Sequence, residues 1–173
     1  GNNLGLLISQ PVEKNALAWD INKQDIKKRT AIVRHTWGED IKSLYKAIAD
    51  DTTKVAHDSE DKSARADMLI ASDCIYNPTY HTALLRSASA LIEPCTGLFI
   101  VGYSLHGNVP TSHVERFFTE AKQEYRLEVV RELVIKYSEG QKGIGSVDEK
   151  RGNVYLKILA CKDSLHCKDI NNL

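Results

Sequence analysis

The chain has 173 residues, of which 42% are hydrophobic and 27% are charged, a composition typical of one globular domain. Lys and Arg together number 23, as do Asp and Glu. This balance argues against a nucleic-acid or anionic-membrane binder with a broad basic surface. The longest apolar run, residues 97–103, is too short to predict a membrane-spanning helix. Without a signal-peptide pattern or a CxxC pair, we expect a reduced protein in the cytoplasm, with the nucleus as a second location.

The first third of the chain predicts a helix, a strand and a second helix. Residues 4–18 are apolar enough for a helix, whose first part Pro11 ends or kinks. Residues 31–37 (AIVRHTW) are short and rich in β-branched side chains, which favours a strand. The charged, aperiodic stretch 50–65 predicts a solvated loop. The second helix, just before that loop, is indicated by apolar residues at i, i+3, i+4 and i+7: Ile41, Leu44, Tyr45 and Ile48.

The middle of the chain predicts two buried strands with a helix between them. Residues 67–73 are a short apolar run, which is typical of a strand buried on both faces. Asn77 is a candidate helix N-cap, with Pro78 at the first helical position. Residues 97–103 predict the second buried strand. The inner stripe of the helix between the two strands consists of Leu84, Leu85, Ala88, Leu91 and Ile92.

The last third predicts one more helix followed by two strands, over residues 127–137 and 153–161. Alternating strands and helices indicate right-handed βαβ units, and hence an α/β fold with a mostly parallel sheet. Residues 138–152 show no helical pattern, so the last two strands should form an antiparallel hairpin at one end of the sheet. The buried stripe of the last helix is Val114, Phe117, Phe118, Ala121 and Tyr125.

Ligands of open α/β sheets bind beyond the carboxyl ends of the parallel strands. This rule selects three segments, residues 35–38, 72–76 and 103–107, each with polar or aromatic side chains after an apolar run. We expect no metal site, because Cys161, His166 and Cys167 lack a fourth ligand. His106 is a candidate base or substrate contact, with a solvated loop histidine as the alternative.

Two of these segments carry a resemblance to a known family. Residues 73–76 read Asp-Cys-Ile-Tyr, and residues 36–38 read Thr-Trp-Gly. Together they resemble the protein-lysine methyltransferases of the seven-strand, S-adenosylmethionine-dependent class, which have an Asp-x-x-Tyr motif after the fourth strand and a Trp-Gly after the third. The resemblance covers about residues 1–161. It implies a Rossmann-like sheet that ends with an antiparallel strand.

The resemblance also implies roles for five residues. Asp73 would hydrogen-bond and orient the incoming lysine ammonium, and Tyr76 would line the lysine channel and offer its ring to the cation. Trp37 would stack on the adenine of S-adenosyl-L-methionine. Ser72, with Ala71 beside it, would let the backbone approach that cofactor closely.

Each role has a structural alternative. Trp37 could be a core residue that caps the sheet, and Tyr76 an ordinary buried aromatic residue. Asp73 could cap a helix or occupy a turn before Asn77. Ser72 could simply end a strand.

The chain departs from the family pattern at its start. The glycine-rich cofactor loop after the first strand and the acidic residue after the second have no counterpart here, and Gly143-Ile144-Gly145 falls in the hairpin loop instead. The chain therefore looks like the carboxyl-terminal part of one methyltransferase domain, with the first strands missing. We expect residues 1–173 alone to be poorly soluble and to bind S-adenosyl-L-methionine too weakly to measure.

The function expected from the resemblance is methyl transfer to a side chain of a protein substrate, with lysine as the first choice. The alternatives within the enzyme class are arginine, histidine or a small molecule as the acceptor. A non-catalytic, truncated α/β module that binds a partner is the alternative outside it. Neither nucleic acid nor membrane is expected as a partner.

Overall fold

The structure, a computed structural model, describes residues 31–52, 65–105, 110–136 and 153–162. Contacts divide the chain into two compact units, and the first contributes residues 31–35 and 42–52 to the described part. Its helix α3 (Lys42–Thr52) has Leu44, Tyr45 and Ile48 partly buried, which confirms the predicted amphipathic helix. The helix extends into the start of the stretch predicted as a loop, and the predicted helix over residues 4–18 lies outside the described residues.

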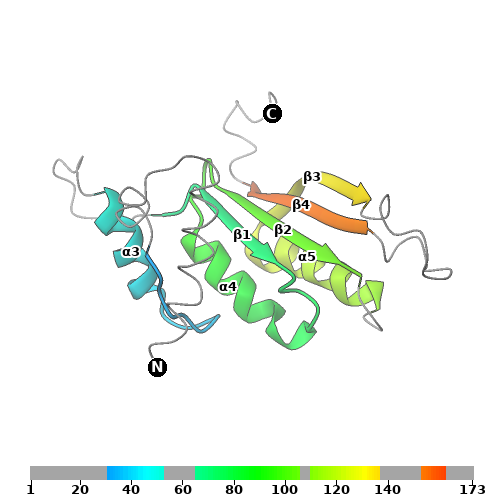
Figure 1. Cartoon of the computed structure of the whole chain (residues 1–173), viewed down its shortest axis with the longest axis horizontal. Helices are drawn as coiled ribbons and strands as arrows, with labels where there is room; N and C mark the ends of the chain where they lie inside the picture. The colour runs from blue at the N-terminus through cyan, green and yellow to red at the C-terminus, as the bar shows by residue number, and fades with distance from the viewer. Residues whose placement is uncertain (1–30, 53–64, 106–109, 137–152, 163–173) are drawn as a thin grey trace, which may run out of the picture. The chain divides into compact units, whose positions relative to one another are not determined.

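The second unit contains a four-stranded mixed sheet. Its strands are β1 (Met68–Ser72), β2 (Leu98–Ser104), β3 (Leu127–Lys136) and β4 (Asn153–Cys161). Their order across the sheet is β1-β2-β4-β3, as Figure 1 shows. Helix α4 (His81–Leu91), preceded by the 3-10 helix η1 (Pro78–Tyr80), connects β1 to β2. Helix α5 (Thr111–Tyr125) lies between β2 and β3 in the chain. The described part of the chain is therefore α/β, as predicted.

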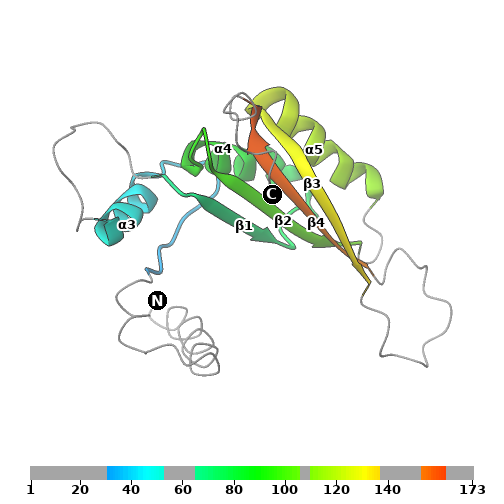
Figure 2. The same cartoon turned by 90° about the horizontal axis from the view of Figure 1, so that it is seen from above.

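Both α4 and α5 lie on the same face of the sheet (Figures 1 and 2). The connections β1-α4-β2 and β2-α5-β3 both progress in one direction across the sheet. Because such crossovers are right-handed, two successive steps in one direction place both helices on one face. The helix stripes predicted from the sequence meet the sheet there.

The core lies between these two helices and the sheet. Phe99 and Val101 on β2 and Leu159 on β4 face it, because the register places Phe99 beside Leu159. The predicted stripe of α4 is buried throughout, while Phe118 and Tyr125 of the α5 stripe are only partly buried. Burial of these apolar side chains is the main term that stabilises the unit. The core residues contributed by the helices and their flanking segments are Ile75, Leu84, Leu85, Ala88, Ile92, Val114, Phe117 and Ala121.

Local signals in the sequence explain where the elements begin and end. Asn77 is an N-cap as predicted, but it caps the 3-10 helix η1, while the N-cap of α4 is Tyr80. The Asn77 side-chain oxygen accepts a hydrogen bond from the Thr79 N–H at 3.0 Å, and Pro78 follows at the first helical position. Helix α5 ends at Arg126, whose left-handed backbone (φ 57°) turns the chain directly into β3. The predicted bounds of β4 match the observed ones, and β3 ends at Lys136.

The expectation of a mostly parallel sheet is wrong. β1 pairs with β2 in parallel, but β4 pairs antiparallel with both β2 and β3. The last two strands do form the predicted hairpin, but the antiparallel strand is not at one end of the sheet. β4 lies between β2 and β3, because the chain returns into the gap that the β2-α5-β3 crossover leaves open.

Two predicted strands differ from the structure. Residues 31–37 form no strand, and no strand of the described residues lies beside them to exchange backbone hydrogen bonds. β1 is a strand, but it is not buried on both faces: Met68 and Ile70 are 53% and 72% exposed. These two side chains lie on the face opposite α4, and β1 is an edge strand of the sheet.

No helix in the described ranges is long and apolar enough to cross a membrane.

Candidate functional site

The segment that follows β1, residues 73–77, lies at the carboxyl ends of the parallel strands β1 and β2. Its backbone turns at Asp73, which adopts a left-handed conformation with φ 52°. Aspartate tolerates this region better than most residues because its short polar side chain fits beside the backbone. The Asp73 N–H donates a hydrogen bond to the Gly102 carbonyl at 2.9 Å. This bond extends the parallel ladder by one step and ties the start of the loop to β2.

The middle of the loop is fixed by the core. Ile75 is only 1% exposed and packs among the buried side chains. His81, also 1% exposed, lies with its Nε2 2.9 Å from the Ile75 carbonyl oxygen. Because a carbonyl can only accept, Nε2 must be the protonated donor of this hydrogen bond. The imidazole also packs edge-to-face on Phe117, with 5.1 Å between ring centroids. The loop is thus held at both Asp73 and Ile75.

The side chains of the two predicted catalytic residues are exposed, although the backbone of their loop is fixed. Asp73 is exposed, and Tyr76 is 64% exposed. The Asp73 carboxylate has no hydrogen bond or ion pair with the described residues, and the adjacent helical cap is Asn77. The interpretation of Asp73 as a helix cap and that of Tyr76 as a buried aromatic residue are therefore wrong. The alternative of Asp73 in a turn before Asn77 is confirmed, because the backbone turns there with φ 52°.

Cys74, between these two residues, is not a ready nucleophile. Partial burial raises the pKa of its thiol, and the negative charge of Asp73 raises it further. The thiol lies 3.1 Å from the Ser72 carbonyl oxygen and donates a hydrogen bond to it, which acts in the opposite direction but does not outweigh burial. Since the thiolate is the reactive form, the raised pKa lowers the reactivity of the Cys74 thiol at neutral pH.

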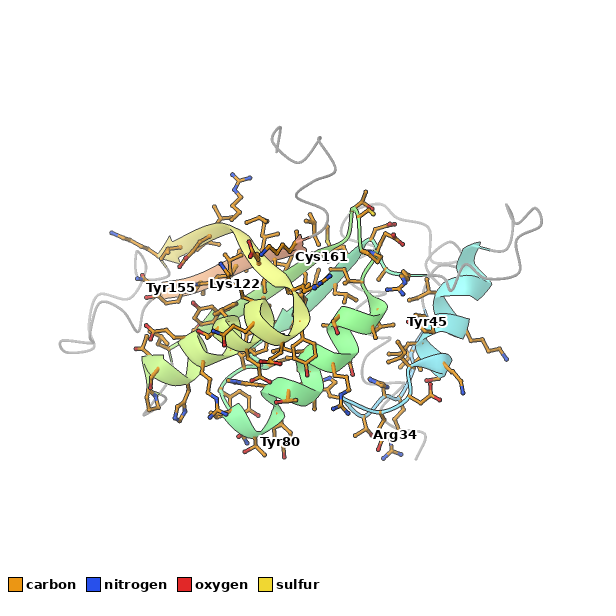
Figure 3. The ribbon with its side chains drawn as sticks, turned by 180° about the vertical axis from the view of Figure 1, so that it is seen from behind. Arg34, Tyr45, Tyr80, Lys122, Tyr155 and Cys161 are labelled. Atoms are coloured by element: carbon orange, nitrogen blue, oxygen red, sulfur yellow. The ribbon has the colours of Figure 1, made fainter. Side chains whose placement is uncertain are left out.

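Trp37 lies along the flank of α4. Its indole meets the Tyr80 ring edge-to-face at 6.4 Å, and the following Gly38 N–H donates a hydrogen bond to the Ser87 hydroxyl at 2.8 Å. Gly38 has φ 85°, and a Cβ at this position would lie 3.2 Å from the Ala83 Cβ. The Trp-Gly pair therefore suits a close approach to the helix. Figure 3 shows Tyr80 at the start of α4. Trp37 is 38% exposed and is not a core residue of the sheet.

Ser72 and Ala71 lie on opposite faces of β1. Ser72 is exposed, and its neighbour across the ladder is Gly102. Ser72 therefore leaves the end of β1 accessible, whereas Gly102 is buried, and a Cβ there would lie 3.2 Å from the Leu156 Cδ2. Ala71 is 6% exposed and belongs to the core. Its side chain is therefore not in a position to meet a ligand.

The structure brings some of the predicted residues together and leaves others apart. Asp73 and Tyr76 share the loop that follows Ser72, the last residue of β1, while Trp37 contacts Tyr80 of η1. None of the five lines the pocket between α5 and the sheet. No three His, Cys, Asp or Glu side chains among the described residues could hold a metal ion. His106, His166 and Cys167 lie outside that part of the chain.

Sequence reasoning missed His81 as the residue that fixes the loop. A signal for it was available, since His81 precedes Leu84, Leu85 and Ala88 by three, four and seven positions. It therefore continues the buried stripe of α4 by one turn. No protein-family model matches the chain, and no curated protein matches it significantly.

Proposed function

We propose that this protein transfers a methyl group from S-adenosyl-L-methionine to a lysine side chain of a protein substrate. The observation that carries the proposal is the loop after β1: Asp73 and Tyr76 are exposed there, while the backbone between them is tied to Gly102 and His81. A fixed backbone with outward-pointing acidic and aromatic side chains is suited to receiving an ammonium group. The parallel β1-β2 pair and the antiparallel last strand also support the resemblance to the methyltransferase fold.

In this proposal Asp73 aligns the acceptor. Methyl transfer to an amine is a direct displacement, in which the protein contributes mainly orientation. A lysine amine has a pKa near 10.4 in water and must lose a proton before it can attack. The Asp73 carboxylate accepts a hydrogen bond from the ammonium and fixes its direction, and the exposed loop lets the released proton pass to solvent. The Tyr76 ring provides one π face for the cation.

The residues present fit the cofactor in part. Trp37 has an indole that is partly exposed and oriented by Tyr80, which suits stacking on a flat base. The exposed Ser72 has a small side chain, which allows close approach to the backbone at the end of β1. The Ala71 side chain does not fit, because it lies in the core. When bound, S-adenosyl-L-methionine would supply the electrophilic methyl group on its sulfonium.

A second candidate function, a partner-binding module without catalysis, is favoured by one observation. The face of the sheet opposite α4 and α5 carries the exposed apolar side chains Met68 and Ile70. Exposed apolar residues grouped on a sheet edge are typical of a surface that another segment or protein covers.

The decisive experiment uses the longest translated product that contains these 173 residues, incubated with radiolabelled S-adenosyl-L-methionine and a hypomethylated cell extract. Hydrolysis of the labelled protein should yield methylated lysine. Asp73→Ala should lower the transfer rate by about a hundredfold, the scale for losing alignment of a reacting group, with cofactor affinity by calorimetry nearly unchanged. Asp67→Ala is the matched control, because Asp67 is an exposed aspartate at the other end of the same strand.

Each outcome of this experiment has a distinct meaning. Recovery of the label on arginine or histidine would show that this residue, and not lysine, is the methyl acceptor. Cofactor binding without transfer to any protein would favour a small-molecule acceptor. Neither binding nor transfer would favour the partner-binding module, and full activity of the Asp73 variant would refute the role of Asp73.

A further inference from the structure

A pocket of about 230 Å³ lies between the first half of α5 and the sheet. Ligand pockets for drug-sized molecules have volumes of roughly 300–1,000 Å³, so this one is sized for a single side chain or a small amine. One wall of the pocket is a single face of α5, because the lining residues of this helix are three or four positions apart. That wall consists of Thr111, Val114, Glu115 and Phe118.

The floor of the pocket consists of two neighbouring cross-strand pairs on the helix-covered face. Tyr103 on β2 is directly opposite Tyr155 on β4, and Lys157 on β4 is directly opposite Glu132 on β3. The two tyrosine rings are stacked, with centroids 5.2 Å apart and planes 13° apart. Figure 3 shows Tyr155 at the end of β4 remote from Cys161. The result is an aromatic surface next to a charged pair.

The pocket already accommodates one ammonium group of this chain. The Lys157 Nζ lies 4.7 Å from the centroid of the Phe118 ring and 3.3 Å from the Glu132 carboxylate. A cation over an aromatic ring, neutralised by a carboxylate, is a stable arrangement for an ammonium group. The walls of this pocket are therefore suited to an ammonium group.

The pocket contains a second carboxylate, that of Glu115, which does not pair with a lysine or arginine of the described residues. The Glu115 carboxylate makes no hydrogen bond or ion pair with any residue that the structure describes, and it lines the pocket together with the tyrosine pair. Glu115 and Glu132 against Lys157 leave one negative charge in excess. Burial, and then the nearby Glu132 charge, raise the pKa of Tyr103 to about 12. Its hydroxyl therefore stays protonated at neutral pH, and its ring stays uncharged.

We propose that this pocket binds the ammonium group of a lysine side chain from a protein partner, between the Glu115 carboxylate and the Tyr103–Tyr155 pair. A primary ammonium has three N–H donors, and the Glu115 carboxylate and the Tyr103 phenol oxygen can accept hydrogen bonds from it, while the Tyr155 ring adds to the aromatic surface. A trimethylated lysine has no N–H donor, an arginine requires a planar fork of acceptors, and an anion would meet the excess negative charge. This binding involves neither Asp73 nor the cofactor, so it can be tested independently of the proposed function.

The test is a titration of the longest translated product that contains these 173 residues, followed by the NMR signals of its tyrosine rings and backbone amides. The probes are capped Gly-Xaa-Gly peptides in which Xaa is lysine, norleucine, trimethyllysine, arginine or glutamate. The lysine peptide should shift the signals of Tyr103 and Tyr155 and bind at least tenfold more tightly than the norleucine peptide. This ratio is the scale for one hydrogen bond to a charged group.

Glu115→Gln should weaken binding of the lysine peptide by about tenfold, because it removes the charge and keeps the shape. Glu124→Gln is the matched control, since Glu124 is an exposed glutamate near the other end of the same helix. It should leave binding unchanged. Both sites are exposed, so neither variant should disturb folding. Equal binding of norleucine, tighter binding of trimethyllysine, arginine or glutamate, an unaffected Glu115 variant, or no binding at all would each overturn the proposal.

Discussion

Replacing His81 with alanine should destabilise the second unit and loosen the candidate site together. The imidazole is 1% exposed, its Nε2 bonds to the Ile75 carbonyl, and its ring packs on Phe117. Its Nδ1 has no hydrogen-bond partner among the residues that the structure describes. The side chain therefore contributes packing and one hydrogen bond, and it already carries the cost of one buried, unsatisfied nitrogen.

The size of the effect follows from these contacts. Removing a buried aromatic side chain of comparable size costs about 3–5 kcal/mol, which includes the cavity that it leaves. The Ile75 carbonyl loses its partner, at a cost of about 1–3 kcal/mol if water does not reach it. Relief of the unsatisfied Nδ1 offsets a similar amount. We therefore expect His81→Ala to lower the free energy of unfolding by about 3–5 kcal/mol, a large part of a typical 5–15 kcal/mol.

Urea denaturation measures this change, and Arg86→Ala is the control, because Arg86 is an exposed residue of the same helix. The control should change the free energy of unfolding by less than about 0.5 kcal/mol. Hydrogen exchange at the Asp73 amide, whose N–H bonds to Gly102, reports on the loop. His81→Phe keeps the ring packing but not the hydrogen bond, so it should speed exchange at Asp73 while preserving most of the stability. A change below 1 kcal/mol in the alanine variant would refute the reasoning.

Three further predictions concern a cofactor contact, two glycines and a tyrosine. In the longest translated product that contains these 173 residues, Trp37→Ala should weaken binding of S-adenosyl-L-methionine by about 1–3 kcal/mol, the scale for one stacked base; an unchanged calorimetric affinity would show that Trp37 only packs on α4. Gly97→Ala should destabilise strongly, because a Cβ there would lie 2.5 Å from the Ile92 Cγ1 and 2.6 Å from a backbone oxygen. Gly102→Ala, which meets only the end of a leucine side chain at 3.2 Å, should cost clearly less in a thermal melt, and equal costs would contradict this. The pKa of Tyr103 is raised from 10.0 to about 12, so its contribution to stability is complete below pH 10 and is lost as the pH rises toward 12; Tyr103→Phe should show a smaller fall in denaturation midpoint over that range.

The sequence by itself determined the elements that depend on neighbouring residues. The α4 stripe, the Asn77 cap and the bounds of β4 were all predicted, because helical periodicity and capping act over a few positions. The placement of Asp73 and Tyr76 just after a parallel strand was also predicted, since it follows from the order of elements. Their proposed chemistry came from the resemblance and stays a prediction.

Only the tertiary structure decided which strands pair and which side chains meet. The position of β4 between β2 and β3 depends on contacts between distant segments, and no local pattern encodes it. The same insertion places Tyr155 beside Tyr103 and Lys157 beside Glu132, and so forms the pocket floor. Residues 31–37 have the composition of a strand but no described partner strand, because a strand needs the backbone groups of a neighbour. His81 likewise acts through a carbonyl that packing brings to it.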